Sequence, residues 1–257
     1  MSYHESTLLK IKKLFTDPKN NIGKIKPFLR SKIEPYKRDI YELIGIDKLS
    51  RPYPGHEKLL QYIDIRDGFF VECGGNDGHF QDPTYYLEKF RGWKGIIVEP
   101  LPIGELCRRN RKKSTVYRTA LVSKDDARKT VDFIDVNAMS FIEGSIEDEK
   151  EWVKAGEYSQ KIERRKISVP AMTIQQVIDE NRSKTGLLEK IDLFVADVEG
   201  FELEVLKGLD FDTNSPTHIL VEAHTDKRLS DIQEFLSSEN YTYITEIGNR
   251  DFLFKIR

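Results

Sequence analysis

Short apolar runs alternate with amphipathic stretches along the chain from residue 56 onward. The clearest apolar runs lie at 69–71, 96–98, 191–196 and 219–221. Uninterrupted apolar strands that alternate with helices are typical of a parallel sheet covered by helices on both faces. A last pair of runs, 241–246 and 252–255, flanks Gly248-Asn249 and predicts an antiparallel hairpin. The pattern therefore predicts a doubly wound, mostly parallel α/β fold that ends in an antiparallel hairpin.

Local signals place the remaining elements. Asp82-Pro83 is a typical helix start, with Asp82 as N-cap and Pro83 at the first helical position. Thr173 and Gln176 have the spacing of a capping box. The third strand is expected at 115–122, and shorter strands are expected at 131–134 and 167–169. The expected helices cover residues 56–63, 82–90, 103–111, 146–160, 173–181, 200–207 and 229–236.

Residues 1–55 are expected to form a separate helical extension, broken at Pro18, Pro27 and Pro35 and followed by a linker at 51–55. Residues 1–51 hold 12 Lys/Arg and 6 Asp/Glu, a balance of +6 in a chain of net charge −2. The basic segment is either a dock for an anionic acceptor or a solvated helical face on an acidic body. It carries no nucleic-acid reader motif, and we expect no nucleic-acid partner.

Composition excludes several classes of protein. No window approaches the roughly 20 uncharged apolar residues that span a bilayer, so no integral membrane segment is expected. The first residues lack the pattern of a signal peptide, and a cytoplasmic location is therefore expected. The two cysteines, Cys73 and Cys107, are too few for a disulfide framework or a four-cysteine zinc site.

Glycines and acids follow the first strand, where parallel sheets bind ligands. The strand at 69–71 runs into Glu72, Cys73, Gly74, Gly75, Asn76, Asp77 and Gly78. Glycines allow a sharp turn and a close approach of backbone to ligand. The spacing differs from G-x-G-x-x-G, and Asp77 would put negative charge where a pyrophosphate sits. The loop therefore favours a ligand with a cationic, phosphate-free end, such as S-adenosylmethionine (SAM), over NAD.

A second acid ends the next strand. Glu99 comes 27 residues after Glu72, and Pro100 fixes the chain that follows it. A carboxylate in this place accepts hydrogen bonds from both hydroxyls of a ribose. Ala120 and Leu121, at the end of the expected third strand, complete the expected cofactor-binding residues.

These blocks resemble the FkbM-type SAM-dependent methyltransferases. The resemblance is carried by residues 68–78, 87–88, 92–95, 98–100 and 191–208, and it extends over about residues 56–255. It implies a Rossmann-like class I methyltransferase domain with a seven-stranded sheet, and O-methylation of sugars or natural-product hydroxyls. Gly75 stands where this family usually has alanine, a change we expect to be harmless. Gln81-Asp82-Pro83-Thr84 replaces a Ser-Asn-Thr-like run, and residues 1–55 lie outside the match.

A third acid, Asp197, ends the expected central strand and is the first candidate for a base that accepts the acceptor's hydroxyl proton. His224, just past the next strand, is the second candidate, and Glu199 is assigned to the same catalytic group. Alternatively, Asp197 caps the helix that starts near Gly200, and His224 lies in a surface loop. Ligation of a divalent metal by Asp197, Glu199 and His224 is a further alternative, but the sequence fixes no geometry for it and no metal is assigned.

The predicted function is SAM-dependent O-methylation of a sugar, glycan or secondary-metabolite hydroxyl. The less regular stretch 123–170 is expected to build part of the acceptor pocket, with Ser140, Arg164 and Arg165 as polar contacts. A non-catalytic methyltransferase-fold protein that binds SAM or a partner is the alternative, and an oxidoreductase ranks third. The expected partner is a small-molecule or saccharide acceptor, and the oligomeric state stays open.

Overall fold

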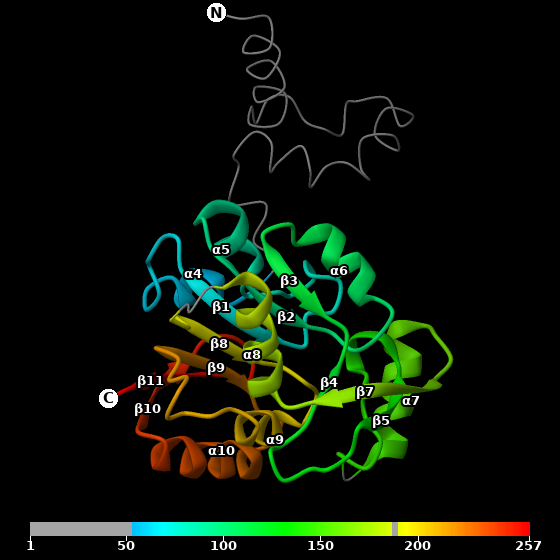
Figure 1. Cartoon of the computed structure of the whole chain (residues 1–257). Helices are drawn as coiled ribbons and strands as arrows, with labels where there is room; N and C mark the ends of the chain where they lie inside the picture. Colours follow the sequence, from blue (N-terminus) through cyan, green and yellow to red (C-terminus); the bar gives the residue numbers. More distant parts are fainter. Residues whose placement is uncertain (1–52, 147, 187–189) are drawn as a thin grey trace, which may run out of the picture. The chain divides into compact units, whose positions relative to one another are not determined.

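The computed structural model describes residues 53–146, 148–186 and 190–257. The helical extension expected over residues 1–55, with its breaks at Pro18, Pro27 and Pro35, lies outside the described residues except for Tyr53, Pro54 and Gly55. The acidic remainder of the chain forms a three-layered α/β domain with a second, smaller sheet beside it (Figure 1). None of the helices described is both long and apolar enough to cross a membrane.

The main sheet has seven strands in the order β10-β11-β9-β8-β1-β2-β3. Its members are β1 (Phe69–Cys73), β2 (Lys94–Val98), β3 (Ser114–Tyr117), β8 (Leu193–Ala196), β9 (His218–Glu222), β10 (Tyr241–Glu246) and β11 (Asp251–Ile256). The pairs among β3, β2, β1, β8 and β9 are parallel, and β11 pairs antiparallel with both β9 and β10. The predicted parallel sheet with an antiparallel terminal hairpin is confirmed.

Helices cover both faces of this sheet because alternate residues of a strand point to opposite sides. On one face Val71 and Cys73 pack in a core with residues of α8 (Ile174–Thr185), α9 (Glu202–Lys207) and α10 (Asp226–Ser238). On the other face Phe70 packs in a second core with residues of α4 (His56–Leu59), α5 (Tyr85–Phe90) and α6 (Gly104–Asn110). Trp93 is fully buried in this second core.

The second sheet has the order β4-β7-β5-β6. Its strands are β4 (Ala120–Leu121), β5 (Thr130–Asp135), β6 (Phe141–Ile142) and β7 (Arg165–Met172), accompanied by the 3-10 helix η4 (Asn137–Met139) and helix α7 (Glu149–Gln160). Figure 1 shows β5, β7 and α7 gathered in green on the right of the view. Most of this sheet is formed by residues 123–170, the stretch whose sequence pattern was less regular.

The expectation of one strand over 115–122 is wrong. The chain leaves β3 after Tyr117 and enters β4 at Ala120, which belongs to the other sheet. The Thr119 hydroxyl donates to the carbonyl of Pro170 at 3.0 Å and so attaches the bend to β7. The residues on both sides of the exposed Arg118 are buried, so the two short strands resemble one strand with a single exposed position, and the pattern did not reveal the change of sheet.

Helix boundaries follow the capping chemistry. Thr173 and Gln176 form the predicted capping box, and α8 runs on to Thr185, beyond the expected end at 181. Asp82 accepts hydrogen bonds from the backbone of Thr84 and Tyr85, so it caps the turn as expected, but α5 itself begins only at Tyr85.

Candidate active site

The parallel strands end in register at one edge of the sheet. Cys73 of β1 pairs with Val98 of β2 and with Ala196 of β8, and Ala196 pairs with Val221 of β9. The residues at or just past these positions are Gly74, Glu99, Asp197 and Glu222, and all four line one cavity of about 310 Å³. The start of the glycine loop and the acids Glu99 and Asp197 therefore meet in a single site, as ligand sites in doubly wound sheets do.

Residues of the second sheet close the other side of this cavity. The lining from this region comprises Phe133, Asn137, Ala138, Met139, Ser140, Ile142 and Gln160. Of the three polar residues expected there, Ser140 lines the cavity, whereas Arg164 and Arg165 are not part of the lining within the described chain. Arg165 instead pairs with Asp135 at 2.8 Å. The stretch 123–170 thus lines part of the cavity, and all the side chains it contributes are neutral.

The two glycines at the start of the loop bring backbone against the sheet. Gly74 has a φ of +94°, and a Cβ there would overlap the carbonyl oxygen of Asp197. A Cβ on Gly75 would overlap the Cγ2 methyl of Ile97, which is β-branched and has little freedom to move. An alanine at position 75, the residue usual in the family, would therefore require a shift of Ile97 in this structure.

Asp77 and Gly78 stabilise the conformation of the glycine loop. Asp77 Oδ1 accepts hydrogen bonds from the backbone of His79 at 2.9 Å and of Phe80 at 2.7 Å. Gly78 has a φ of +72° and packs against Cys107 and Arg111. Asn76 lines the cavity, but Asp77 and Gly78 are not among the described lining residues. Asp77 thus sets the turn of the loop.

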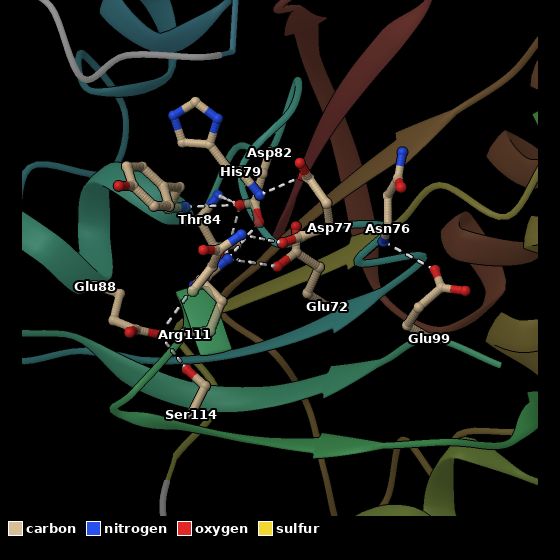
Figure 2. A network of polar contacts seen from close by, with 12 residues as sticks. Glu72, Asn76, Asp77, His79, Asp82, Thr84, Glu88, Glu99, Arg111 and Ser114 are labelled. Atoms are coloured by element: carbon tan, nitrogen blue, oxygen red, sulfur yellow. Dashed lines mark hydrogen bonds and ion pairs between the residues drawn. The ribbon is translucent and has the colours of Figure 1, made fainter. Parts of the chain in front are cut away.

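Glu99 is the best-placed of the predicted cofactor-binding acids. Its carboxylate accepts hydrogen bonds from the backbone of Asn76 at 2.8 Å and of Leu101 at 2.9 Å, the first of which is drawn in Figure 2. Burial raises the pKa of Glu99 to about 7, although these two hydrogen bonds oppose the rise. Pro100 and Leu121 also line the cavity, whereas Ala120 is buried beneath it.

Glu72 lines the same cavity but belongs to a buried ionic network. Its Oε2 accepts a 2.7 Å hydrogen bond from the Thr84 hydroxyl and lies 3.4 Å from Arg111 Nη1. The Arg111 side chain is fully buried and also pairs with Asp82 and with Glu88 (Figure 2). Burial is the main cause that raises the pKa of Glu72. Because a buried carboxylate needs such a partner, Arg111 fixes the wall of the cavity behind Glu72.

Sequence reasoning missed Arg111 as a site residue. It lies in the run Arg108-Arg109-Asn110-Arg111-Lys112-Lys113, where it looks like one more solvated base. The available signal was the number of acids in the first loop and helix, since Glu72, Asp82 and Glu88 cannot all be buried without a cation. Phe80 was also missed; it lines the cavity with an exposed ring.

The predicted catalytic residues gather beyond the ends of β8 and β9. His224 Nε2 lies 3.1 Å from Glu199 Oε2 and 3.2 Å from Glu222 Oε2. The His224 ring also packs against Trp152 of α7, with ring centroids 5.0 Å apart. The histidine is half-buried and lies in the loop between β9 and α10. Glu222 is the member of this group that the sequence did not single out.

Asp197 presents an exposed surface to the cavity. Its enclosure by protein, followed by repulsion from Glu199, Asp251 and Glu202, raises the pKa of Asp197. Burial and the charge of Asp197 likewise raise the pKa of Glu222 to about 11. The hydrogen bond to Glu199 is the main cause that raises the pKa of His224.

The N-cap of helix α9 is Phe201, and no described side chain caps the helix, so the capping role considered for Asp197 is not seen; Glu202 instead ties down the loop that precedes the helix. Glu202 Oε1 accepts hydrogen bonds from the backbone of Gly200 at 2.7 Å and of Val198 at 3.2 Å. Among the described hydrogen bonds, none runs from the helix backbone to the Asp197 carboxylate. The Asp197 side chain is exposed to the cavity beside Glu222, with which it shares a side-chain hydrogen bond.

The sequence of residues 72–244 matches the methyltransferase FkbM domain family. The hexuronic acid methyltransferase AglP of Haloferax volcanii is 36% identical over 82 residues, a match that covers 32% of this chain and only 34% of that protein. Among solved structures, precorrin-6y C5,15-methyltransferase from Geobacter metallireducens aligns at 10% identity with a TM-score of 0.41, covering 77% of this chain and 83% of that one.

A SAM-dependent methyltransferase from Aquifex aeolicus aligns at 10% identity with a TM-score of 0.38, covering 87% of this chain and 95% of that one. Both structural likenesses are distant. The family match, by contrast, extends from the acid that ends β1 into the terminal hairpin and includes every acid of the cavity described above. The chain belongs to the FkbM methyltransferase family.

Proposed function

We propose that this methyltransferase transfers the methyl group of SAM to a hydroxyl of a sugar, glycan or secondary metabolite. The observation that supports the proposal is the layout of one cavity. Glu99 and the glycine loop lie at the ends of β1 and β2, and Asp197 lies at the end of β8 next to them. A SAM molecule whose adenosine lies against Glu99 and the glycine loop would present its sulfonium toward Asp197.

The cofactor end suits an adenosyl group without phosphate. Glu99 keeps lone pairs beyond the two that its backbone partners use, and these are suited to accept the ribose hydroxyls. Val98, Leu101 and Leu121 offer apolar surface for the adenine. The acids around the cavity would favour the cationic sulfonium and ammonium and disfavour a pyrophosphate. In this proposal Glu72, Gly74, Gly75, Asn76 and Pro100 complete the cofactor pocket.

The reaction is a displacement at the methyl carbon. The acceptor hydroxyl gives its proton to Asp197, and its oxygen attacks the methyl carbon of SAM. The carbon–sulfur bond breaks, its electron pair stays on sulfur, and S-adenosylhomocysteine and the methyl ether are released. Holding oxygen and methyl in line contributes up to about 7–11 kcal/mol, and the base contributes about 10²–10⁴-fold.

A sugar-like acceptor is favoured by the polar lining opposite the cofactor end. Asn137, Ser140 and Gln160 offer amide and hydroxyl groups of the kind that hydrogen-bond neutral hydroxyls. The exposed ring of Phe80 offers an apolar face at the same cavity. The hexuronic acid named for the Haloferax volcanii relative gives a first acceptor to test.

The proposed methyltransferase domain is residues 56–257, with residues 1–55 as a separate extension. Tyr53, which was expected in the linker, is buried and donates a 2.7 Å hydrogen bond to Asp251, so the packed domain includes at least this residue. The cytoplasmic location stays a prediction.

The test is methyl transfer from radiolabelled SAM to glucuronides, neutral glycosides and a cellular glycan extract. Label in an alkali-stable methyl ether, together with S-adenosylhomocysteine formation, supports O-methylation. Methyl esters, which alkali cleaves, would move the reaction to a carboxylate. SAM binding without transfer to any acceptor would favour the non-catalytic alternative, and the absence of SAM binding would contradict the proposal.

A further inference from the structure

Two carboxylates and one imidazole converge beyond the ends of β8 and β9. One donor atom from each of Glu199, Glu222 and His224 lies within 4.8 Å of the other two. The His224 Nε2 atom is nearly equidistant from the two carboxylates, at 3.1 Å and 3.2 Å. Donor atoms about 2.1 Å from one metal ion stand about 3.0–3.4 Å apart in tetrahedral or octahedral geometry, so these separations suit a shared ion.

Hydrogen bonding alone leaves this cluster unsatisfied. An imidazole Nε2 carries at most one proton and can donate to only one of the two carboxylates. The contact to Glu199 has hydrogen-bond geometry. Glu222 Oε2 is buried and has no hydrogen-bond donor by geometry among the described residues, although the Glu222 side chain also interacts with the neighbouring Asp197 carboxyl group. A buried carboxylate oxygen without a donor is costly, and a cation placed between the three side chains would satisfy it.

The surrounding charges also favour a cation. Asp197, Glu202 and Asp251 add three carboxyl groups to Glu199 and Glu222. The cationic side chains described beside them are Arg228, which donates to the Gly200 carbonyl and lies 3.9 Å from Glu202 Oε2, and Arg250, whose Nε donates to the Ala223 carbonyl at 2.7 Å. Five acids thus face two arginines and one histidine, and such an excess of negative charge attracts a counter-ion.

We propose that Glu199, Glu222 and His224 bind a divalent first-row metal ion such as Mn²⁺ or Zn²⁺. Carboxylate ligands suit Mn²⁺ and imidazole suits Zn²⁺, so the mixed donor set fits this class of metal. Glu222 here takes the place that the sequence-based alternative gave to Asp197. Trp152, packed against the His224 ring, holds the imidazole in position.

The role of the ion rests on the proposed function. Glu199 and Glu222 line the cavity, so an ion held by them is accessible to the acceptor. Coordination of an acceptor hydroxyl would lower its pKa and orient its oxygen toward the methyl carbon. Asp197 is not one of the three ligands and remains the group that takes the proton.

The first experiment titrates the chelator-treated full chain with Mn²⁺, followed by electron paramagnetic resonance, and with Zn²⁺, followed by calorimetry. We expect one site for at least one of the ions, weakened at least about tenfold in Glu222→Gln and in His224→Ala. Glu99→Gln is the matched control, because it lies in the same cavity at the cofactor end: it should keep the metal and lose SAM affinity. Unchanged metal affinity in both ligand variants, or the absence of a site in the wild type, overturns the proposal.

A second experiment needs no variant and therefore tests the site even if the ligand variants fail to fold. Anomalous diffraction from wild-type crystals soaked in Mn²⁺ or Zn²⁺ should place the ion between the three side chains, and a peak elsewhere or none would overturn the site. The two proposals fail separately. A protein that methylates an acceptor without binding metal refutes only the metal site, and one that binds metal at this place without using SAM refutes only the proposed function.

Discussion

Glu99, at the end of β2, accepts a 2.8 Å hydrogen bond from the backbone of Asn76 in the loop that follows β1. This contact joins the glycine loop to the neighbouring strand and holds the Glu99 carboxylate at the cavity. The acid that is proposed to bind the ribose therefore also fixes the loop against which the rest of the cofactor lies.

Replacing Glu99 should abolish tight binding of SAM. Glu99→Ala removes the acceptor for both ribose hydroxyls and for the Asn76 amide, and hydrogen bonds to a charged group contribute about 1.5–3 kcal/mol each. We expect a loss of SAM affinity of at least about 100-fold, measured by isothermal titration calorimetry. NAD should bind to neither protein; NAD binding by the wild type would contradict the cofactor assignment.

Cofactor affinity should depend on pH through Glu99. Its pKa of about 7 means that the carboxyl group is mostly protonated at pH 6 and mostly ionised at pH 8. The ionised form is the better acceptor, so binding should weaken as pH falls, by about tenfold from pH 8 to pH 6. 5′-Methylthioadenosine is a suitable probe because it keeps the ribose and lacks the titrating amino acid. The profile should flatten in Glu99→Gln; an equally steep profile there would assign the titration to another group.

Asp197→Asn should impair chemistry without impairing cofactor binding. The amide keeps the size of the side chain but cannot accept the acceptor's proton. We expect kcat to fall by about 10²–10⁴-fold while the dissociation constant for SAM stays the same. Asp179→Asn, on the exposed surface of α8, is the control and should retain full turnover. Full turnover in Asp197→Asn would show that another group is the base.

Arg111 should be essential for stability, in contrast to Arg108 in the same helical segment. Arg111→Met would leave Glu72, Asp82 and Glu88 buried without their cation, at a cost of about 3–5 kcal/mol. Arg108 is half-exposed and pairs with Glu105 on the surface, so Arg108→Met should cost at most about 1 kcal/mol. Urea unfolding measures both variants, and equal destabilisation would contradict the role of the buried network.

The parallel direction of the main strands could be predicted from the chain alone, whereas their order in the sheet came from the structure. Parallel strands that are buried on both faces must be apolar along their length, and this property is visible without knowing their neighbours. The same holds for the glycine loop and for Glu72, Glu99 and Asp197, since an acid directly after a buried strand is placed at the sheet edge by the backbone itself. The capping box at Thr173 is likewise a local signal, and it was confirmed.

Other features became visible only in the folded chain. The pairing of Arg111 with three acids and the approach of Glu222 to His224 both join side chains through loop conformation and strand register. The division of residues 115–122 between two sheets depends on the bend at Thr119, which the burial of both halves conceals. Sequence thus determined which elements form and which acids reach the sheet edge, because these follow from local periodicity. Tertiary structure decided which of those side chains contact one another, because such contacts depend on distances between segments far apart in the chain.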